Sequence, residues 1–172
     1  AAATRLFRNN GSGRFTNVAA EAVLTVASPV QAVVPTDFDN RRDIDVLVVS
    51  TTTAALFRNE RDGTFRDVAA DVGLRVDGGA AMAAIGDVNK DGYSDFFFPR
   101  PDGEGVLAAS DGRGRFAISN GPAGSSQARA AQFVDYDNDG LLDLFVLTAR
   151  GPGLFRNAGR SWTDVTATAI PP

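Results

Sequence analysis

Three nine-residue segments of the sequence concentrate acidic side chains, and each begins and ends with an aspartate. They are Asp37–Asp45, Asp87–Asp95 and Asp135–Asp143. Carboxylates crowded in this way repel one another strongly unless a cation lies among them. The last two segments follow the pattern Asp-x-(Asp or Asn)-x-Asp-Gly-x-x-Asp, an arrangement of oxygen ligands suited to calcium. The chemistry that these residues suggest is therefore cation binding.

The net charge of −4 conceals an uneven distribution of charge along the chain. The three acidic loops hold 11 of the 21 acidic residues and three of the 17 basic residues, so they carry −8 and the rest of the chain carries +4. The acidity is therefore local to the loops. Two bound divalent ions would bring the total charge to about zero.

The composition excludes several kinds of catalytic or binding site. The chain has no cysteine and no histidine, which rules out disulfides, thiol chemistry, a Ser-His-Asp triad and a histidine-ligated zinc site. The arginines form no basic stripe, so we expect no nucleic-acid binding. No apolar run reaches eighteen residues, which predicts no membrane span. We also expect no enzymatic activity, because the only phenols, Tyr93 and Tyr136, lie within the acidic loops.

A longer repeat contains the acidic loops. The segment Leu6–Asn9 recurs as Leu56–Asn59 and Leu154–Asn157, with a looser copy at Leu107–Ser110. Successive copies begin 50, 51 and 47 residues apart. Each copy leads through a glycine-bearing turn to an aromatic residue, and these aromatics are Phe15, Phe65, Phe116 and Trp162.

Each repeat predicts four short strands, A to D. Strand A precedes the acidic loop, strand B follows it, strand C carries Leu-Phe-Arg-Asn, and strand D carries the aromatic residue. Four antiparallel strands in about 50 residues are typical of a β-propeller blade. Weak helical periodicity and 18 glycines disfavour a solenoid of helix pairs. The expected A strands are 81–85 and 130–134, and the expected B strands are 44–50, 96–98 and 142–148.

The predicted fold is all-β, with about three and a half propeller blades. We expect a half blade at 5–28, made of strands C and D, and full blades at 29–78, 79–127 and 128–172. A closed ring usually needs four to eight blades, and an open one exposes sheet edges. We therefore expect missing blades or another chain to complete the ring and to supply strands A and B to the half blade.

The repeat resembles the FG-GAP (VCBS) repeats of integrin-type β-propellers, from about Leu6 to Val165. The string Leu-Phe-Arg-Asn, followed by Gly-x-Phe and Val-Ala-Ala-Glu, is similar to the subgroup found in cartilage acidic protein and in bacterial ASPIC/UnbV proteins. This resemblance implies that the loop between strands A and B binds Ca²⁺. It also implies that the propeller is an adhesion or recognition surface, usually outside the cell.

The acidic loops are not EF-hands, because position 12 of each falls on an apolar residue, Phe98 or Val146, where an EF-hand needs glutamate. The ligand set must close at position nine, and Gly92 and Gly140 would allow the sharp turn around the ion. We expect two Ca²⁺ sites with a mainly structural role; solvated turns and magnesium are the alternatives. The expected ligands are Asp87, Asn89, Asp91, the Tyr93 carbonyl and Asp95, and Asp135, Asp137, Asp139, the Leu141 carbonyl and Asp143.

The loop 37–45 departs from the pattern and makes a third site doubtful. Arg41 and Arg42 replace the fifth ligand and the turn glycine, and Asp43 adds a carboxylate. In one hypothesis the Arg41 guanidinium lies among the carboxylates and replaces the ion. In the other, Arg41 points outward and calcium binds more weakly. The candidate ligands are Asp37, Asp39, Asp43 and Asp45.

An antiparallel blade places the metal loops and the C–D turns on one face and the other connections on the opposite face. We expect a protein or glycan to bind that opposite face. We expect the recurring arginines to have a blade-packing or inter-blade hydrogen-bonding role, and the recurring aromatics to lie in the core between blades. The calcium concentration is high enough to occupy the sites of such modules outside the cell. We therefore expect the chain to be extracellular, periplasmic or at the cell surface. The alternatives are a calcium-dependent polysaccharide-cleaving propeller enzyme and a structural subunit of a larger complex. The opposite-face segments are 51–53, 75–79, 100–105, 119–127 and 150–153.

Overall fold

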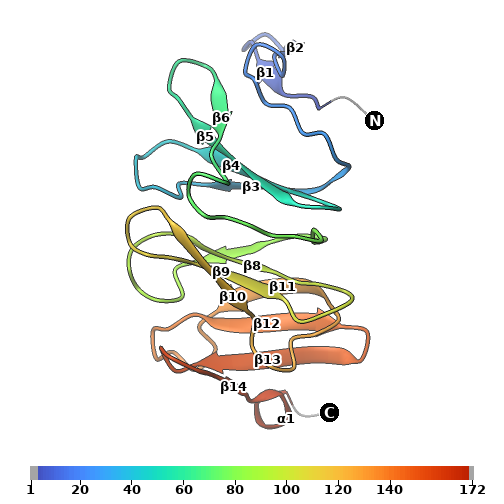
Figure 1. The fold of residues 1–172 in the computed structure, drawn as a ribbon, viewed down its shortest axis with the longest axis vertical. Coiled ribbons are helices and arrows are strands. Elements are labelled where there is room, and N and C mark those ends of the chain that lie inside the picture. Colours follow the sequence, from blue (N-terminus) through green and yellow to red (C-terminus); the bar gives the residue numbers. More distant parts are fainter. Residues whose placement is uncertain (1–3, 171–172) are drawn as a thin grey trace.

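The computed structural model describes residues 4–170, which form four antiparallel sheets and one short helix. Figure 1 shows the sheets following one another along the longest axis of the molecule. The first sheet pairs β1 (Phe7–Asn9) with β2 (Phe15–Asn17). The second contains β3 (Val30–Thr36), β4 (Asp45–Ser50), β5 (Ala54–Asn59) and β6 (Phe65–Asp67).

The third sheet contains β7 (Ala84–Gly86), β8 (Asp95–Phe98), β9 (Val106–Ser110) and β10 (Phe116–Asn120). The fourth contains β11 (Ala128–Val134), β12 (Asp143–Thr148), β13 (Gly151–Asn157) and β14 (Trp162–Asp164). The helix α1 (Thr166–Ala169) follows the last strand. Among the described residues, no helix has the length and apolar character needed to cross a membrane.

The strand order in each four-stranded sheet follows the chain, and every neighbouring pair is antiparallel. This meander is the predicted A-B-C-D arrangement, and β1 and β2 are the predicted C and D strands of a half blade. The all-β fold of partial propeller blades is therefore confirmed. Each acidic loop connects the first two strands of its sheet, so the sheet holds both ends of the loop.

The sheets pack face to face, and the side chains of strand B contribute to the cores on both faces of its sheet. In β8, Phe96 and Phe98 belong to the core shared with the preceding blade, whereas Phe97 belongs to the core shared with the following blade. All three side chains are fully buried. Side chains alternate between the two faces of a strand, so a sheet covered on both faces needs an uninterrupted apolar run.

One predicted strand is shorter than expected. The first strand of the third sheet begins at Ala84, although the sequence suggested a start at Ala81. Its partner β8 ends at Phe98, immediately before Pro99. Proline has no N–H to donate to a sheet ladder, so the pairing between these strands stops at Ala84 and Phe97.

Candidate metal centre

The first aspartate of each acidic loop organises the backbone of that loop. Asp87 accepts hydrogen bonds from the N–H groups of Asp91, at 3.1 Å, and Gly92, at 2.8 Å. Asp37 accepts from the two corresponding N–H groups, both at 3.0 Å, and Asp135 accepts from Gly140 at 3.0 Å. The chain is therefore wrapped around this carboxylate in all three loops.

The ninth aspartate ties each loop to strand C. Asp45, Asp95 and Asp143 are fully buried. Each accepts a hydrogen bond from the N–H of the last residue of strand C, at 2.8, 2.6 and 2.8 Å in that order. Asp95 also accepts one from Val88, and Asp143 one from Tyr136, near the start of the loop. The sequence predicted only a ligand role for these residues and missed this structural role.

Burial weakens the acidity of two carboxyl groups, those of Asp45 and Asp95. It raises the pKa of Asp45 to about 6 and that of Asp95 to about 6, against hydrogen bonds from the backbone that lower both. Neighbouring carboxylates, Asp39 in one loop and Asp91 in the other, raise the pKa further. A cation beside such a group would favour the ionised form.

All three loops follow the same backbone path, including the loop that lacks the turn glycine. The fourth residue of each has a left-handed φ between 57° and 59°. The sixth residue is also left-handed, at 83° for Gly92, 85° for Gly140 and 66° for Arg42. The loss of glycine from the loop 37–45 therefore leaves its geometry unchanged, with an arginine in a conformation that side chains other than glycine rarely adopt.

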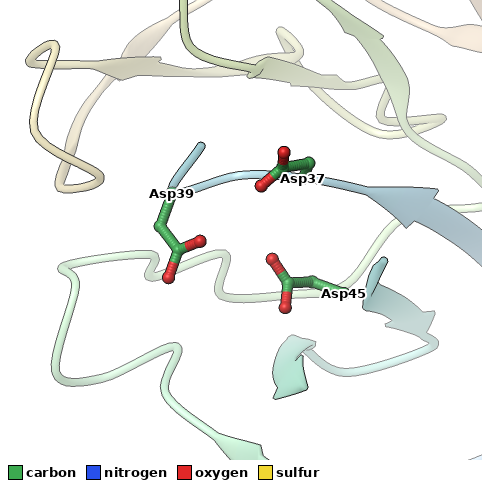
Figure 2. Close-up of side chains that lie close together, drawn as sticks. All are labelled: Asp37, Asp39 and Asp45. Carbon is green, nitrogen blue, oxygen red and sulfur yellow. The ribbon is translucent and has the colours of Figure 1, made fainter. Parts of the chain in front are cut away.

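Two of the loops gather three carboxylates in one place. Oxygens of Asp37, Asp39 and Asp45 all lie within 4.8 Å of one another, and Figure 2 shows the three side chains directed toward a common space. Asp135, Asp137 and Asp139 form a second group of this kind. The loop that departs from the sequence pattern therefore has one of the two carboxylate clusters.

The loop 87–95 is fully described and forms no such group of three carboxylates. Its third position is Asn89, whose amide nitrogen donates to Asp91 Oδ2, at 3.2 Å, and to the Ser110 carbonyl, at 2.9 Å. The amide oxygen accepts from the Asp91 N–H at 3.0 Å. This loop thus has one fewer carboxylate than the loop 135–143, because its third residue is Asn89 where the other loop has Asp137.

Unpaired oxygens test whether the clusters fit a cation. Asp39 Oδ1, Asp45 Oδ2 and Asp135 Oδ1 are buried and have no hydrogen-bond partner within the described residues. Buried polar atoms are normally satisfied, because leaving one unpaired costs about 1–3 kcal/mol. Unpaired carboxylate oxygens within a cluster are suited to a hard cation such as calcium. The loop 37–45 has two such oxygens and the loop 135–143 has one, so both sets of ligands fit this ion.

The arginine of strand C reaches the acidic loop in the last blade. Arg156 donates to Asp137 Oδ2 at 2.6 Å and to Asp139 Oδ2 at 2.8 Å, and the hydrogen bond to Asp137 raises the pKa of the arginine. The equivalent Arg58 pairs with Glu60 at 2.8 Å instead. The expectation of inter-blade bonding is wrong for these two arginines, because each pairs with acids of its own blade.

Two arginines surround the extra carboxylate of the loop 37–45. Arg61 Nε donates to Asp43 Oδ1 at 2.6 Å. The Arg41 guanidinium lies 3.8 Å from Asp39 and 3.8 Å from Asp43. Of the clustered carboxylates, only Asp39 is an ion-pair partner of Arg41, so the guanidinium lies at the edge of the cluster.

The acidic loops lie beside one another and beside the C–D turns, as the topology predicted. The side chain of Asn40 donates to the carbonyl of Gly92 in the next loop at 2.7 Å. In the third sheet, the C–D turn packs against the acidic loop: a Cβ added to Gly112 in that turn would lie 3.6 Å from the Cβ of Asp91. On the opposite face, connections meet through a 2.8 Å bond between the hydroxyls of Ser28 and Thr52.

An asparagine missed by the sequence analysis connects two blades. Asn157, at the end of β13, is 3% exposed and donates to the carbonyl of Val88 in the preceding metal loop at 2.8 Å. Its recurrence in Leu-Phe-Arg-Asn was the available signal. The predicted packing of aromatics between blades is confirmed for Phe116, whose ring lies 6.3 Å from Phe38, whereas Phe15 is 61% exposed.

The fold and the loops define a partial β-propeller with candidate cation loops between the first two strands of its full blades. The FG-GAP-like repeat family matches residues 37–98 and 87–146, well over half of the chain. The chain therefore belongs to this family. The assignment to the cartilage acidic protein and ASPIC/UnbV subgroup stays a prediction.

A solved structure shares the fold. It is a lectin from Agrocybe aegerita, described for its specific recognition of non-reducing terminal N-acetylglucosamine. The two chains are 18% identical, with a TM-score of 0.58 over 91% of this chain and 44% of the lectin chain. The present chain thus spans less than half the length of the lectin. No curated protein matches it significantly.

Proposed function

We propose that the chain is a calcium-binding β-propeller module that serves as a protein- or glycan-recognition scaffold. The observation that carries the calcium assignment is the convergence of three carboxylates in the loop 37–45, where Asp39 and Asp45 each have a buried, unpaired oxygen, and of three in the loop 135–143, where Asp135 has one. Membership of the FG-GAP-like repeat family supports the same assignment. The proposed ligands are those predicted from the sequence, with the loop 37–45 as a weaker third site.

The bound ion would supply positive charge among crowded carboxylates and so stabilise the fold. At free calcium about 100 times the dissociation constant, each site would add about 2.7 kcal/mol to the free energy of unfolding. Dissociation constants near 10⁻⁴ M are common among extracellular modules. The proposal therefore places the chain outside the cell, in the periplasm or at the cell surface.

The proposed recognition surface is the face opposite the metal loops. Its connections are held together by backbone hydrogen bonds, such as those from Gly121 to Gly105, at 2.7 Å, and from Gln127 to Gly103, at 3.2 Å. Loops fixed on a rigid scaffold are common positions for binding residues. Because a lectin of similar fold recognises terminal N-acetylglucosamine, glycans ending in this sugar are the first ligands to test.

A glycan array probed with calcium-loaded and chelated protein tests the proposal. Arg150→Ala alters an exposed residue on the proposed face, and Arg113→Ala alters an exposed residue in a C–D turn on the metal-loop face. We expect calcium-dependent binding that Arg150→Ala weakens and Arg113→Ala leaves intact. The reverse pattern would contradict the proposed face. Absence of binding to any glycan, and to matrix proteins in a parallel array, would contradict the recognition role.

The proposal assigns no catalytic activity to the chain. Acidic polysaccharide incubated with the calcium-loaded protein should keep its viscosity. A loss of viscosity that chelation prevents would instead establish the polysaccharide-cleaving alternative.

A further inference from the structure

An apolar groove of about 630 Å³ lies between the first, two-stranded sheet and the second sheet. Val33 on β3 and Val46 and Val48 on β4 line one wall, and Leu6 and Leu24 lie opposite. An exposed apolar surface of this kind on a soluble protein marks a place where another apolar element is buried.

The same strand positions are covered in the other two full blades. Val33 stands four residues before the first aspartate of its acidic loop and is 61% exposed. Ala83 and Ala131 occupy this position in the next blades and are 6% and 7% exposed. Seven residues before the aspartate, Val30 is 42% exposed and Ala80 is 7% exposed. The face of the second sheet that is directed toward the first sheet is therefore exposed at these positions. The corresponding faces of the third and fourth sheets are covered by the sheet before them.

The closed interfaces show which element is missing from the open one. In the core between the second and third sheets, Leu47 and Val49 of β4 pack with Phe96 of β8. Strand B of one blade therefore covers the face of the next blade. At the groove, the preceding sheet contains only β1 and β2, which are strands C and D. Among the described strands, β1 pairs only with β2, so the edge at which strand B would pair is free.

The groove also continues an interface that already exists. Leu24, Val48 and Phe57 form a small core between the first two sheets, and Leu6 packs against it. This core corresponds to the outer part of the interface between complete blades. An element seated in the groove would extend it toward the inner strands β3 and β4.

We propose that the groove is the seat of a strand–acidic loop–strand hairpin from a further FG-GAP-like repeat. Its second strand pairs with the free edge of β1, and the apolar face of the hairpin covers Val33, Val46 and Val48. A second copy of this chain does not fit. Each of its described A–B hairpins is already paired with its own strand C, through β4–β5, β8–β9 and β12–β13, and would have to leave its own sheet.

A fusion that supplies the hairpin tests the proposal. Thr4 aligns with Ala54, so a copy of residues 29–53 placed directly before Thr4, replacing residues 1–3, reproduces the connection between β4 and β5. We expect the thermal midpoint to rise by about 5 °C or more, in chelator as well as in calcium. Hydrogen exchange at the amides of residues 4–7 should also slow. The chelated measurement separates this result from the calcium proposal.

Two controls make the fusion specific. Replacing Leu47 and Val49 by aspartate in the added copy alone should abolish the gain, because these side chains would face the groove. Val33→Asp in the receiving sheet should do the same, whereas Leu147→Asp, at a residue 50% exposed on the far face of the last sheet, should not. Unchanged stability and exchange in the fusion would overturn the proposal. So would a dimer of the unmodified chain in light scattering that Val33→Asp dissociates, since the groove would then seat a second copy.

Discussion

The loops 87–95 and 135–143 share one sequence pattern and one backbone path, yet they differ in charge. Arg156 of strand C lies against two carboxylates of the loop 135–143. The same strand position of the preceding blade is Ala109, and an amide replaces one carboxylate there. If these loops bind a cation as proposed, the neighbouring strand should influence the affinity of each loop, which the loop motif alone does not reveal.

The loop 37–45 extends this comparison. It has lost the pattern at two positions but keeps both left-handed backbone positions and a cluster of three carboxylates. The hydrogen bonds of its first and ninth aspartates are also kept. Loop geometry thus depends more on these two carboxylates than on the glycine between them.

The largest expected effect comes from the ninth aspartate, whose role is the same in both loops. Asp95→Ala and Asp143→Ala each leave two backbone donors unpaired, and we expect a loss of about 1–3 kcal/mol for each donor. Urea denaturation in chelator measures this loss. Asp91→Ala, at the more accessible fifth position, is the matched control. An equal loss in Asp91→Ala would show that the ninth carboxylate has no special structural role.

The free energy of unfolding should depend on pH differently in the metal-free protein and in the calcium-loaded protein. The pKa of Asp45 and that of Asp95 are about 6, above the unfolded value near 4. The metal-free folded state therefore binds more protons between these values, and its free energy of unfolding should fall as pH rises from about 4 through 6.

Calcium requires the ionised form of these carboxylates, so its affinity should fall below pH 6, by roughly tenfold per pH unit for each linked proton. Calorimetric titrations at pH 5 and pH 7 measure this change. Asp95→Asn removes one titrating group and should flatten the profile. An affinity that does not change between these pH values would contradict a direct role for the buried carboxylates.

Arg41→Asp tests whether the loop 37–45 binds calcium in the natural sequence or holds the Arg41 guanidinium in its place. Because Arg41 lies at the edge of the carboxylate cluster, we expect the calcium stoichiometry to stay the same and the affinity of this loop to rise several-fold. Arg42→Asp is the control, since the sixth position does not supply a ligand. An increase of one in the stoichiometry for Arg41→Asp would instead show that the guanidinium replaces the ion in the natural sequence.

A reciprocal exchange of arginine addresses the difference between the other two loops and has the smallest expected effect. Arg156→Ala should raise the calcium affinity of the loop 135–143 by roughly two- to fivefold, because an exposed ion pair contributes little. Ala109→Arg should lower the affinity of the loop 87–95 by a similar factor. Arg160→Ala, in a C–D turn, should leave both unchanged. If the calcium affinity of each loop were the same in the unmodified chain and in all three variants, the residue on strand C would not explain the difference between the loops.

The strand order and the position of the loops were predictable because two local signals recur at a regular period: an acidic loop between apolar runs, and a segment that reads Leu-Phe-Arg-Asn in three of its four copies. The early end of the ladder at Pro99 was also visible in the sequence. The pairing of Arg156 with Asp137 was not, because a long side chain can reach either its own blade or the next. The backbone role of Asp95 was hidden for a similar reason, since an aspartate can accept hydrogen bonds and bind a metal.

The central claim is that the acidic loops bind calcium. The most direct measurement is a calorimetric titration of calcium into chelator-stripped protein that circular dichroism shows to be folded. We predict two stronger sites and one weaker site, with the weaker site lost in Asp39→Ala. Absence of binding by the folded protein would contradict the claim, and the loops would then be turns held together by their own hydrogen bonds.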